Sequence, residues 1–170
     1  MKKMTKYNKY SSSNGIITTK WGPSAWNYLF CSIMGAYPFT IESKNYEHSQ
    51  IKKEFKNLFS SLQYTLPCPT CQESYRIYWK EIPIDDYMSG RISLMNWLYK
   101  IKDRVNKKLI CQENELFKIE KNKINQIYKV KDISKEKYDK IIKKLKDKIC
   151  ITEKSIPFIS VLNYYESKRA

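Results

Sequence analysis

The sequence contains few of the residues that form turns, glycine and proline, and it lacks a long apolar run. Only four of its 170 residues are glycine and six are proline, too few for the closely spaced turns of a β-sandwich or barrel. No stretch approaches the roughly 18 apolar residues that a membrane-spanning helix needs. Residues 1–20 are basic but lack the apolar segment of a secretory signal peptide. We therefore expect a helical chain with no transmembrane segment and no signal peptide, whose compartment the sequence does not decide.

Histidine and cysteine are also scarce. The chain has one histidine, His48, and five cysteines, of which only Cys68 and Cys71 are closely spaced. Structural zinc normally needs a second close cysteine pair or paired histidines, so we expect no metal site. Five cysteines are also too few to hold a chain of this length together as a disulfide scaffold. The single close pair favours redox chemistry instead.

The chain has a large excess of basic residues, with 32 Lys and Arg against 17 Asp and Glu and a formal charge of +15. Clustered basic residues bind nucleic acids and other polyanions by releasing counterions. Here the excess is spread along the chain, and residues 112–150 mix lysines with acids as a solvated helical face does. We expect no specific nucleic-acid binding, and we expect residues 1–20 to form a basic flexible arm.

Apolar residues recur every three or four positions in much of the chain, a spacing typical of helices that pack on a core. This pattern predicts four helices, at 23–37, 50–64, 69–79 and 94–109. Pro38 and Pro83 close the first and third of these. Short loops between such helices predict an all-α four-helix bundle. Weaker stripes within residues 112–150 predict additional C-terminal helices at its periphery.

The sequence Cys68-Pro69-Thr70-Cys71 stands at the predicted start of the third helix. Two cysteines at this spacing can form and open a disulfide without large backbone movement. The helix N-terminus stabilises a thiolate at the first position, which predicts that Cys68 is the exposed, attacking sulfur. Cys71 is one turn further in and is predicted to be the inner sulfur, beside a buried electron acceptor. Cys31, on the first helix, is predicted to be a small buried hydrophobe.

Several short motifs share an order and spacing that resemble a known family. They are WGPSAWNYL at 21–29, AYP at 36–38, LPCPTC at 66–71, WL at 97–98 and VNKKL at 105–109. Together they resemble the Erv/ALR sulfhydryl oxidases from about residue 21 to 111, and the Trp-Gly-Pro opening resembles members encoded by large DNA viruses. For such a viral protein, the host cytoplasm or the virion is the expected compartment.

This resemblance implies that residues 21–111 form an FAD-binding bundle, usually dimeric, that oxidises dithiols and reduces molecular oxygen to hydrogen peroxide. Cys71 would lie against the isoalloxazine ring, and Cys68 would exchange disulfides with a dithiol protein substrate, for which a thioredoxin-like protein is one candidate. Residues 112–170 would form a basic helical extension. The resemblance leaves open whether Cys111 and Cys150 are bridged.

The resemblance also implies a set of cofactor contacts. Trp26 and Tyr37 match aromatic positions that line the flavin, although Trp26 would equally suit burial in a helical core. Phe30 and the pair Lys102-Asp103 stand where the family usually has His and His-Asn. The full implied set is Trp21, Gly22, Trp26, Phe30, Tyr37, Lys102, Asp103, Asn106 and Lys108. The alternative function is that of a redox-inactive relative that binds a protein or a polyanion.

Overall fold

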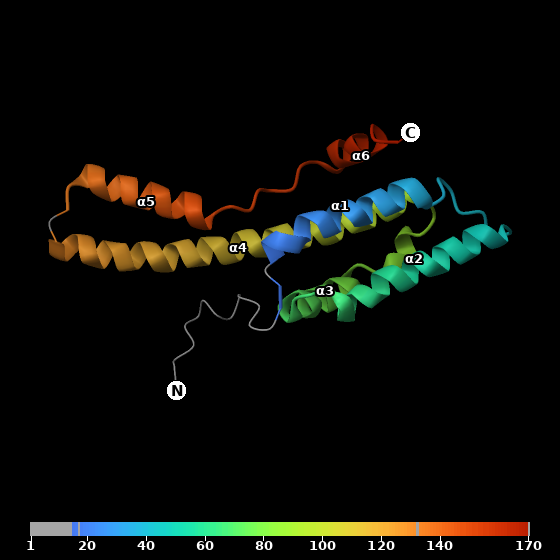
Figure 1. Cartoon of the computed structure of the whole chain (residues 1–170), viewed down its shortest axis with the longest axis horizontal. Coiled ribbons are helices and arrows are strands. Elements are labelled where there is room, and N and C mark those ends of the chain that lie inside the picture. The colour runs from blue at the N-terminus through green and yellow to red at the C-terminus, as the bar shows by residue number, and fades with distance from the viewer. Residues whose placement is uncertain (1–14, 17, 132, 170) are drawn as a thin grey trace. The chain divides into compact units, whose positions relative to one another are not determined.

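The structure is a computed structural model that describes residues 15, 16, 18–131 and 133–169, without the side chains of 129–131. Residues 1–14 of the predicted basic arm therefore lie outside the described residues. Every regular element among the described residues is helical (Figure 1), and this confirms the predicted all-α fold class. The elements are α1 (Thr18–Ala36), α2 (Tyr46–Thr65), α3 (Pro69–Glu81), the short 3-10 helix η2 (Ile84–Tyr87), α4 (Arg91–Lys131), α5 (Lys135–Ile149) and α6 (Phe158–Glu166).

Local sequence explains where several of these helices begin. The side chain of Asn45 accepts a hydrogen bond from the His48 N–H at the start of α2, and Ser134 accepts one from the Lys137 N–H at the start of α5, as helix-capping residues do. In contrast, α1 begins five residues before the predicted start, at Thr18, and runs through Pro23. The proline removes one intrahelical donor but does not end this helix.

The chain divides into two compact units, one comprising the residues up to Lys102 together with those from Ile156 onward, the other comprising Asp103–Ser155. This division differs from the one expected from sequence, in which a bundle ends at residue 111. Helix α4 passes residue 111 without a break, and α6 belongs to the first unit rather than to a separate extension. None of the described helices combines the length and apolarity that crossing a bilayer requires.

The core of the first unit is a cluster of aromatic and aliphatic side chains from α1, α2, α3, η2 and α4. Phe59 of α2 is fully buried, and its ring centroid lies 4.8 Å from that of Trp97 on α4. The Tyr75 hydroxyl of α3 donates to the Phe59 carbonyl over 3.0 Å, and α2 and α3 lie side by side (Figure 1). Burial raises the pKa of Tyr75, which keeps this phenol neutral inside the core.

A second set of hydrogen bonds fixes the end of α1 against the start of α4. The Tyr37 hydroxyl donates to the Met88 carbonyl over 2.9 Å, and the Arg91 Nε donates to the Tyr37 carbonyl over 2.8 Å. A side chain at Gly90 would come within 2.2 Å of the Phe39 carbonyl oxygen, so only glycine permits this close approach of the two loops. Burial raises the pKa of Tyr37 to about 12.

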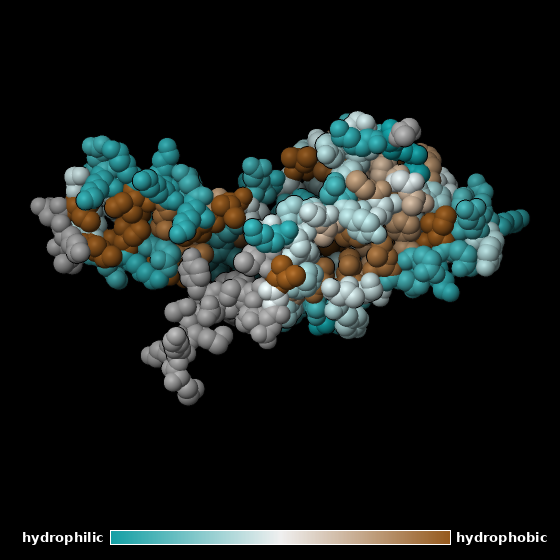
Figure 2. Space-filling view, in the orientation of Figure 1, coloured by the Kyte–Doolittle hydropathy of each residue, from teal (hydrophilic) through white to brown (hydrophobic). Residues whose placement is uncertain are grey.

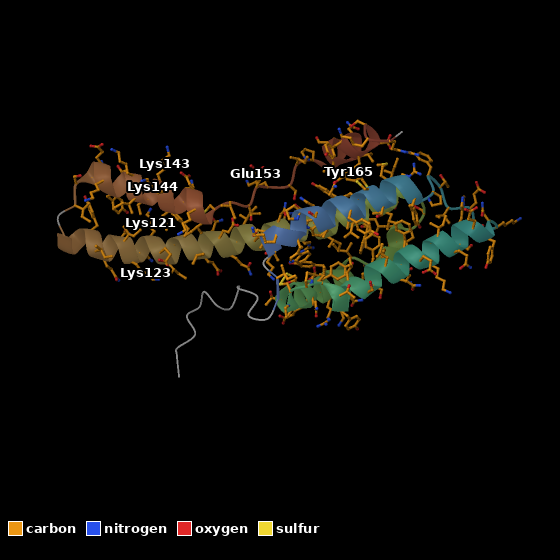
Figure 3. The ribbon with its side chains drawn as sticks, in the orientation of Figure 1. Lys121, Lys123, Lys143, Lys144, Glu153 and Tyr165 are labelled. Carbon is orange, nitrogen blue, oxygen red and sulfur yellow. A yellow bond between two sulfur atoms is a disulfide. The ribbon has the colours of Figure 1, made fainter. Side chains whose placement is uncertain are left out.

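The second unit pairs the C-terminal half of α4 with α5 in antiparallel fashion. The Tyr138 hydroxyl donates to the Asn125 Oδ1 over 2.6 Å, while the Thr152 N–H, after α5, donates to the Glu113 Oε2 over 3.0 Å. Apolar side chains gather along the seam between the two helices, with hydrophilic ones on the outer side of α5 (Figure 2). Lysines carry much of the hydrophilic surface of this unit, among them Lys121 and Lys123 on α4 and Lys143 and Lys144 on α5 (Figure 3).

The substitution Phe59→Ala is predicted to lower the free energy of unfolding by about 3–5 kcal/mol, because it empties a fully buried site in the centre of the first unit. Chemical denaturation followed by circular dichroism measures this loss. Phe39→Ala is the matched control, because Phe39 is 66% exposed and its truncation should cost less than about 0.5 kcal/mol. Equal losses in the two variants would contradict the described core.

Candidate redox site

Cys68 and Cys71 are joined in a disulfide at the start of α3, with their Cα atoms 5.2 Å apart. This confirms that the two cysteines form a pair. Cys68 has an extended backbone and caps the helix, and Pro69 follows in the first turn, where its missing N–H costs nothing. The Cys68 carbonyl accepts hydrogen bonds from the N–H groups of Cys71 and Gln72, both over 3.0 Å. The bridge is thus built into the first turn of a helix.

Two hydrogen-bond donors contact the sulfur of Cys68. The Cys71 N–H points at the Cys68 Sγ over 3.3 Å, and the Thr70 Oγ1 lies 3.2 Å from the same sulfur. A disulfide sulfur carries no hydrogen, so the threonine hydroxyl is the donor of this contact. When the bridge opens, both donors and the positive end of the helix would stabilise a thiolate at Cys68. Cys68 is therefore the better leaving sulfur of the pair.

The exposure of the two sulfurs differs from the prediction. Cys68 is only 3% exposed, whereas Cys71 is partly exposed, so the prediction that Cys68 is the exposed sulfur is wrong. Its role as the sulfur that exchanges with a substrate stays a prediction. The N-terminal segment approaches this turn: the Ile16 N–H donates to the Pro67 carbonyl over 2.9 Å, and Gly15 lies against the backbone of Pro67 and Cys68.

The side chain of Gln72 secures the other side of the same corner. Its Nε2 donates to the Leu66 carbonyl over 2.8 Å and to the Tyr64 carbonyl over 3.0 Å. These carbonyls lie at the C-terminal end of α2, where a helix has no backbone donors left to satisfy them. The residue after Cys71 therefore ties α2 to α3.

The remaining three cysteines are free. Cys31 and Cys111 are exposed and Cys150 is partly buried, so Cys111 and Cys150 are not bridged to one another. The prediction that Cys31 is buried is wrong. The buried face of α1 carries Leu29, Phe30, Ile33 and Met34, and Cys31 lies off this stripe.

Phe30, which the sequence assigned to the cofactor, is 2% exposed and is covered by α6. Its ring lies nearly parallel to that of Tyr165, with centroids 5.1 Å apart and an interplanar angle of 22°. The Tyr165 hydroxyl donates to the Asn27 Oδ1 over 3.3 Å, and Figure 3 shows Tyr165 on the side of α6 that faces α1. Sequence reasoning gave α6 no role at this position, although its adjacent tyrosines were the available signal.

The other predicted cofactor residues of the first unit have varied surroundings. The hydroxyl of Tyr37 is engaged by Met88. The Trp21 indole N–H donates to the Ile16 carbonyl over 3.1 Å, so Trp21 and the cysteine corner are both bonded to the same residue. A side chain at Gly22 would meet open space, and Trp26 is partly buried against the core.

The predicted residues on α4 fall at the division between the units. Lys102 is the last residue of the first unit before the second unit begins, and Asp103, Asn106 and Lys108 belong to the second unit. The Asn106 Nδ2 donates to the Ser155 Oγ over 3.2 Å, and the Lys107 Nζ lies 2.7 Å from the Asp103 Oδ2. Partial burial raises the pKa of Asp103, but hydrogen bonds from Lys107 and Ser155 and nearby positive charge outweigh it and lower the pKa overall.

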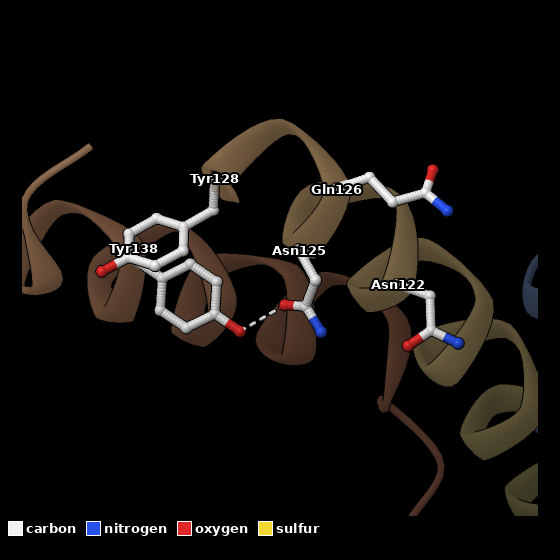
Figure 4. A pocket seen from close by; sticks show the side chains of 5 residues that line it. All are labelled: Asn122, Asn125, Gln126, Tyr128 and Tyr138. Carbon is white, nitrogen blue, oxygen red and sulfur yellow. Dashed lines mark hydrogen bonds between the residues drawn. The ribbon is translucent and has the colours of Figure 1, made fainter. Parts of the chain in front are cut away.

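The second unit has a pocket whose lining residues all come later in the sequence than the predicted cofactor residues. It is lined by amide and phenol groups from Asn122, Asn125, Gln126, Tyr128 and Tyr138 (Figure 4). Two of these, Tyr138 and Asn125, are hydrogen-bonded to each other. The described residues of the lining include no thiol, carboxylate or imidazole, so this pocket offers no group for thiol–disulfide exchange.

An all-helical unit with a disulfide in the first turn of a helix defines a class of helical proteins suited to thiol–disulfide exchange. The model of the Erv1/Alr family matches residues 23–140, which is more than half of the chain. The chain belongs to the Erv1/Alr family. Among solved structures, the crystal structure of the yeast Erv1 core is similar, with 23% sequence identity, a TM-score of 0.47, and coverage of 63% of this chain and 83% of that one. No curated protein matches the chain.

The contact of Tyr165 with Phe30 predicts a pH dependence for α6. Burial, helped by the neighbouring Cys31 and Tyr164, raises the pKa of Tyr165 from 10.0 to about 12. Because the folded state favours the neutral phenol, its contribution to the docking of α6 is complete below pH 10.0 and is lost as the pH rises toward about 12. An alkaline titration followed by carbon NMR of labelled tyrosine rings measures the midpoint. In Phe30→Ala the midpoint should fall toward 10.0, and an unchanged midpoint would contradict the stacking as its cause.

Proposed function

We propose that this chain is an FAD-dependent thiol oxidase that forms disulfides in a dithiol substrate through Cys68 and Cys71. The observation that carries the proposal is the disulfide between these residues in the first turn of α3, in a chain of the Erv1/Alr family. A helix start is suited to this chemistry because it stabilises the thiolate that each opening of the bridge produces.

The exchange with substrate needs only the cysteine pair and the first turn of α3. A substrate thiolate attacks one sulfur of the bridge, a new sulfur–sulfur bond forms, and the electron pair of the old bond goes to the other sulfur as a thiolate. The second substrate thiolate then attacks its own partner sulfur and releases the remaining cysteine as a thiolate. The substrate is oxidised by two electrons, and the pair is reduced by two. The Thr70 hydroxyl and the Cys71 N–H hold the negative charge on the Cys68 side.

The reduced pair must pass its two electrons to an acceptor before it can act again. When bound, FAD would supply this two-electron acceptance and their transfer to molecular oxygen, which gives hydrogen peroxide. The residues present fit FAD chemically, because Trp26 has an aromatic ring at the edge of the core and Lys102 of the same unit has a positive charge that suits a phosphate. The roles of Trp21, Gly22, Asp103, Asn106 and Lys108 toward the cofactor remain predictions.

The partners follow from the same proposal. The substrate would be a dithiol protein, with a thioredoxin-like carrier as one candidate, and oxygen would be the final acceptor. A homodimer and the likeness to members encoded by large DNA viruses belong to the proposal as well. No shuttle pair of cysteines exists elsewhere in the chain, so the substrate would have to react at the Cys68–Cys71 corner directly.

One observation favours a second function, that of a redox-inactive relative that binds a partner. Tyr165 stacks on Phe30, and the hydroxyl of Tyr37 is hydrogen-bonded within the core. Two of the aromatic residues assigned to the flavin are thus occupied by contacts with other residues of the chain. A colourless protein that folds normally would support this alternative, whereas flavin absorption bands in the purified protein would support the oxidase.

Cys68→Ser and Cys71→Ser are each predicted to reduce oxygen consumption with dithiothreitol to the rate of buffer alone, because neither variant can form the bridge. An oxygen electrode measures the rate. Cys31→Ser and Cys111→Ser are the matched controls, since both cysteines are free and exposed, and they should retain the wild-type rate. Oxygen consumption that survives Cys71→Ser would rule out the proposed role of the pair.

Tyr165→Ser is predicted to raise the affinity for FAD, because it frees the ring face of Phe30 for the cofactor. An aromatic contact of this kind contributes about 1 kcal/mol, so the affinity should rise about fivefold. A titration of flavin-free protein with FAD, followed by flavin fluorescence, measures the change. Tyr164→Ser is the control, because Tyr164 is 54% exposed. A lower affinity in Tyr165→Ser would show instead that α6 helps to hold the cofactor.

A further inference from the structure

Helix α3 carries an arginine, Arg76, whose guanidinium group is held by two neighbouring side chains. The guanidinium carbon lies 5.1 Å from the centre of the Tyr64 ring, near the end of α2. The Arg76 Nη2 donates to the Gln72 Oε1 over 3.4 Å, one helical turn closer to the cysteine pair. Because a guanidinium stacked on an aromatic ring keeps its planar fork of donors in place, this charge has a defined position beside α3.

The side chain of Gln72 connects this charge to the first turn of α3. Its backbone N–H donates to the Cys68 carbonyl over 3.0 Å. Its side-chain nitrogen donates to the carbonyls of Tyr64 and Leu66, over 3.0 Å and 2.8 Å. The nitrogen is thereby oriented toward the end of α2, and the amide oxygen is left to accept from Arg76. One amide therefore both fixes the end of α2 and orients the arginine.

The arginine is close enough to the cysteine pair to contact a molecule that reacts there. Cys68, Gln72 and Arg76 follow one another at four-residue spacing, so each lies next to the following one on the helix surface. Arg76 comes five residues after Cys71, which is about 8 Å along the helix axis. Tyr64 beside it is 70% exposed, so a partner can approach this position from solvent.

The charge of Arg76 is not balanced by an acid of the chain. Within the described residues, Arg76 takes part in no ion pair, and Glu73, one turn earlier, is exposed and does not pair with it. An arginine with available donors suits a carboxylate, which it can hold with two parallel hydrogen bonds. The formal charge of +15 on the chain also favours the approach of an acidic partner.

We propose that Arg76 is a specificity-determining residue that binds a carboxylate close to the thiols of the substrate. The inference rests on the proposed function, since it assigns a recognition group to the substrate of the same cysteine pair. The partner that fits is a dithiol protein with an acidic residue near its reactive cysteines. The guanidinium binds this carboxylate while the Tyr64 ring supports it from one face.

The experiment compares two dithiols that differ only in charge, dihydrolipoate and dihydrolipoamide. In both, four methylene groups separate the dithiol from the carboxylate or the amide, a length comparable to the distance along α3. The full chain with its bridge intact is mixed with either dithiol in the absence of oxygen, quenched with acid and alkylated. Mass spectrometry then gives the rate at which Cys68 and Cys71 each gain a label. This exchange needs no flavin, so it is measured separately from the oxidase activity.

The wild-type protein should react faster with dihydrolipoate than with dihydrolipoamide. In Arg76→Gln this preference should fall about fivefold, the effect of losing one partly exposed ion pair. Arg76→Lys should keep only part of the preference, because it retains the charge but loses the planar fork.

Lys53→Gln is the matched control, because it removes the same charge from an exposed side chain of α2, about three turns before Tyr64. It should keep the wild-type preference. A wild-type protein that reacts equally with both dithiols would overturn the proposal, as would an equal loss of preference in Arg76→Gln and Lys53→Gln. A preference that depends on Arg76, in a protein that consumes no oxygen, would count against the oxidase function and leave this role of Arg76 standing.

Discussion

The first turn of α3 is the interaction on which the rest of the site depends. Cys68 accepts hydrogen bonds from this turn with both its carbonyl and its sulfur, so the same amides that begin the helix also prepare the sulfur for negative charge. Pro69 suits this first turn because it has no N–H that needs a partner. The same local structure therefore serves both folding and the proposed redox chemistry. A change to the cap would alter both.

Much of the fold could be predicted from the sequence, because helical periodicity and proline are local signals. The stripes at 50–64 and 69–79 correspond to α2 and α3, and Pro83 indeed follows the end of α3. The full length of α4 was missed, although its 41 residues contain neither glycine nor proline. That absence was the available sign that the helix continues.

The candidate site was harder to predict, because burial at the cysteine pair is not a local property. The spacing of Cys68 and Cys71 predicted the pair, but it could not show that Gly15 and Ile16, some fifty positions earlier in the chain, lie against the same backbone. Phe30 posed a similar problem, since its cover comes from Tyr165 at the other end of the chain. Periodicity within a helix shows which face is apolar and says nothing of which distant segment covers it.

The hydrogen bonds of Gln72 bear on how the proposed oxidase would pass through repeated cycles. Its amide holds the end of α2 through the carbonyls of Leu66 and Tyr64, and neither bond involves sulfur. These bonds between α2 and α3 therefore do not require the disulfide. In the proposed thiol oxidase, disulfide exchange would then require no conformational entropy for re-forming the joint between α2 and α3.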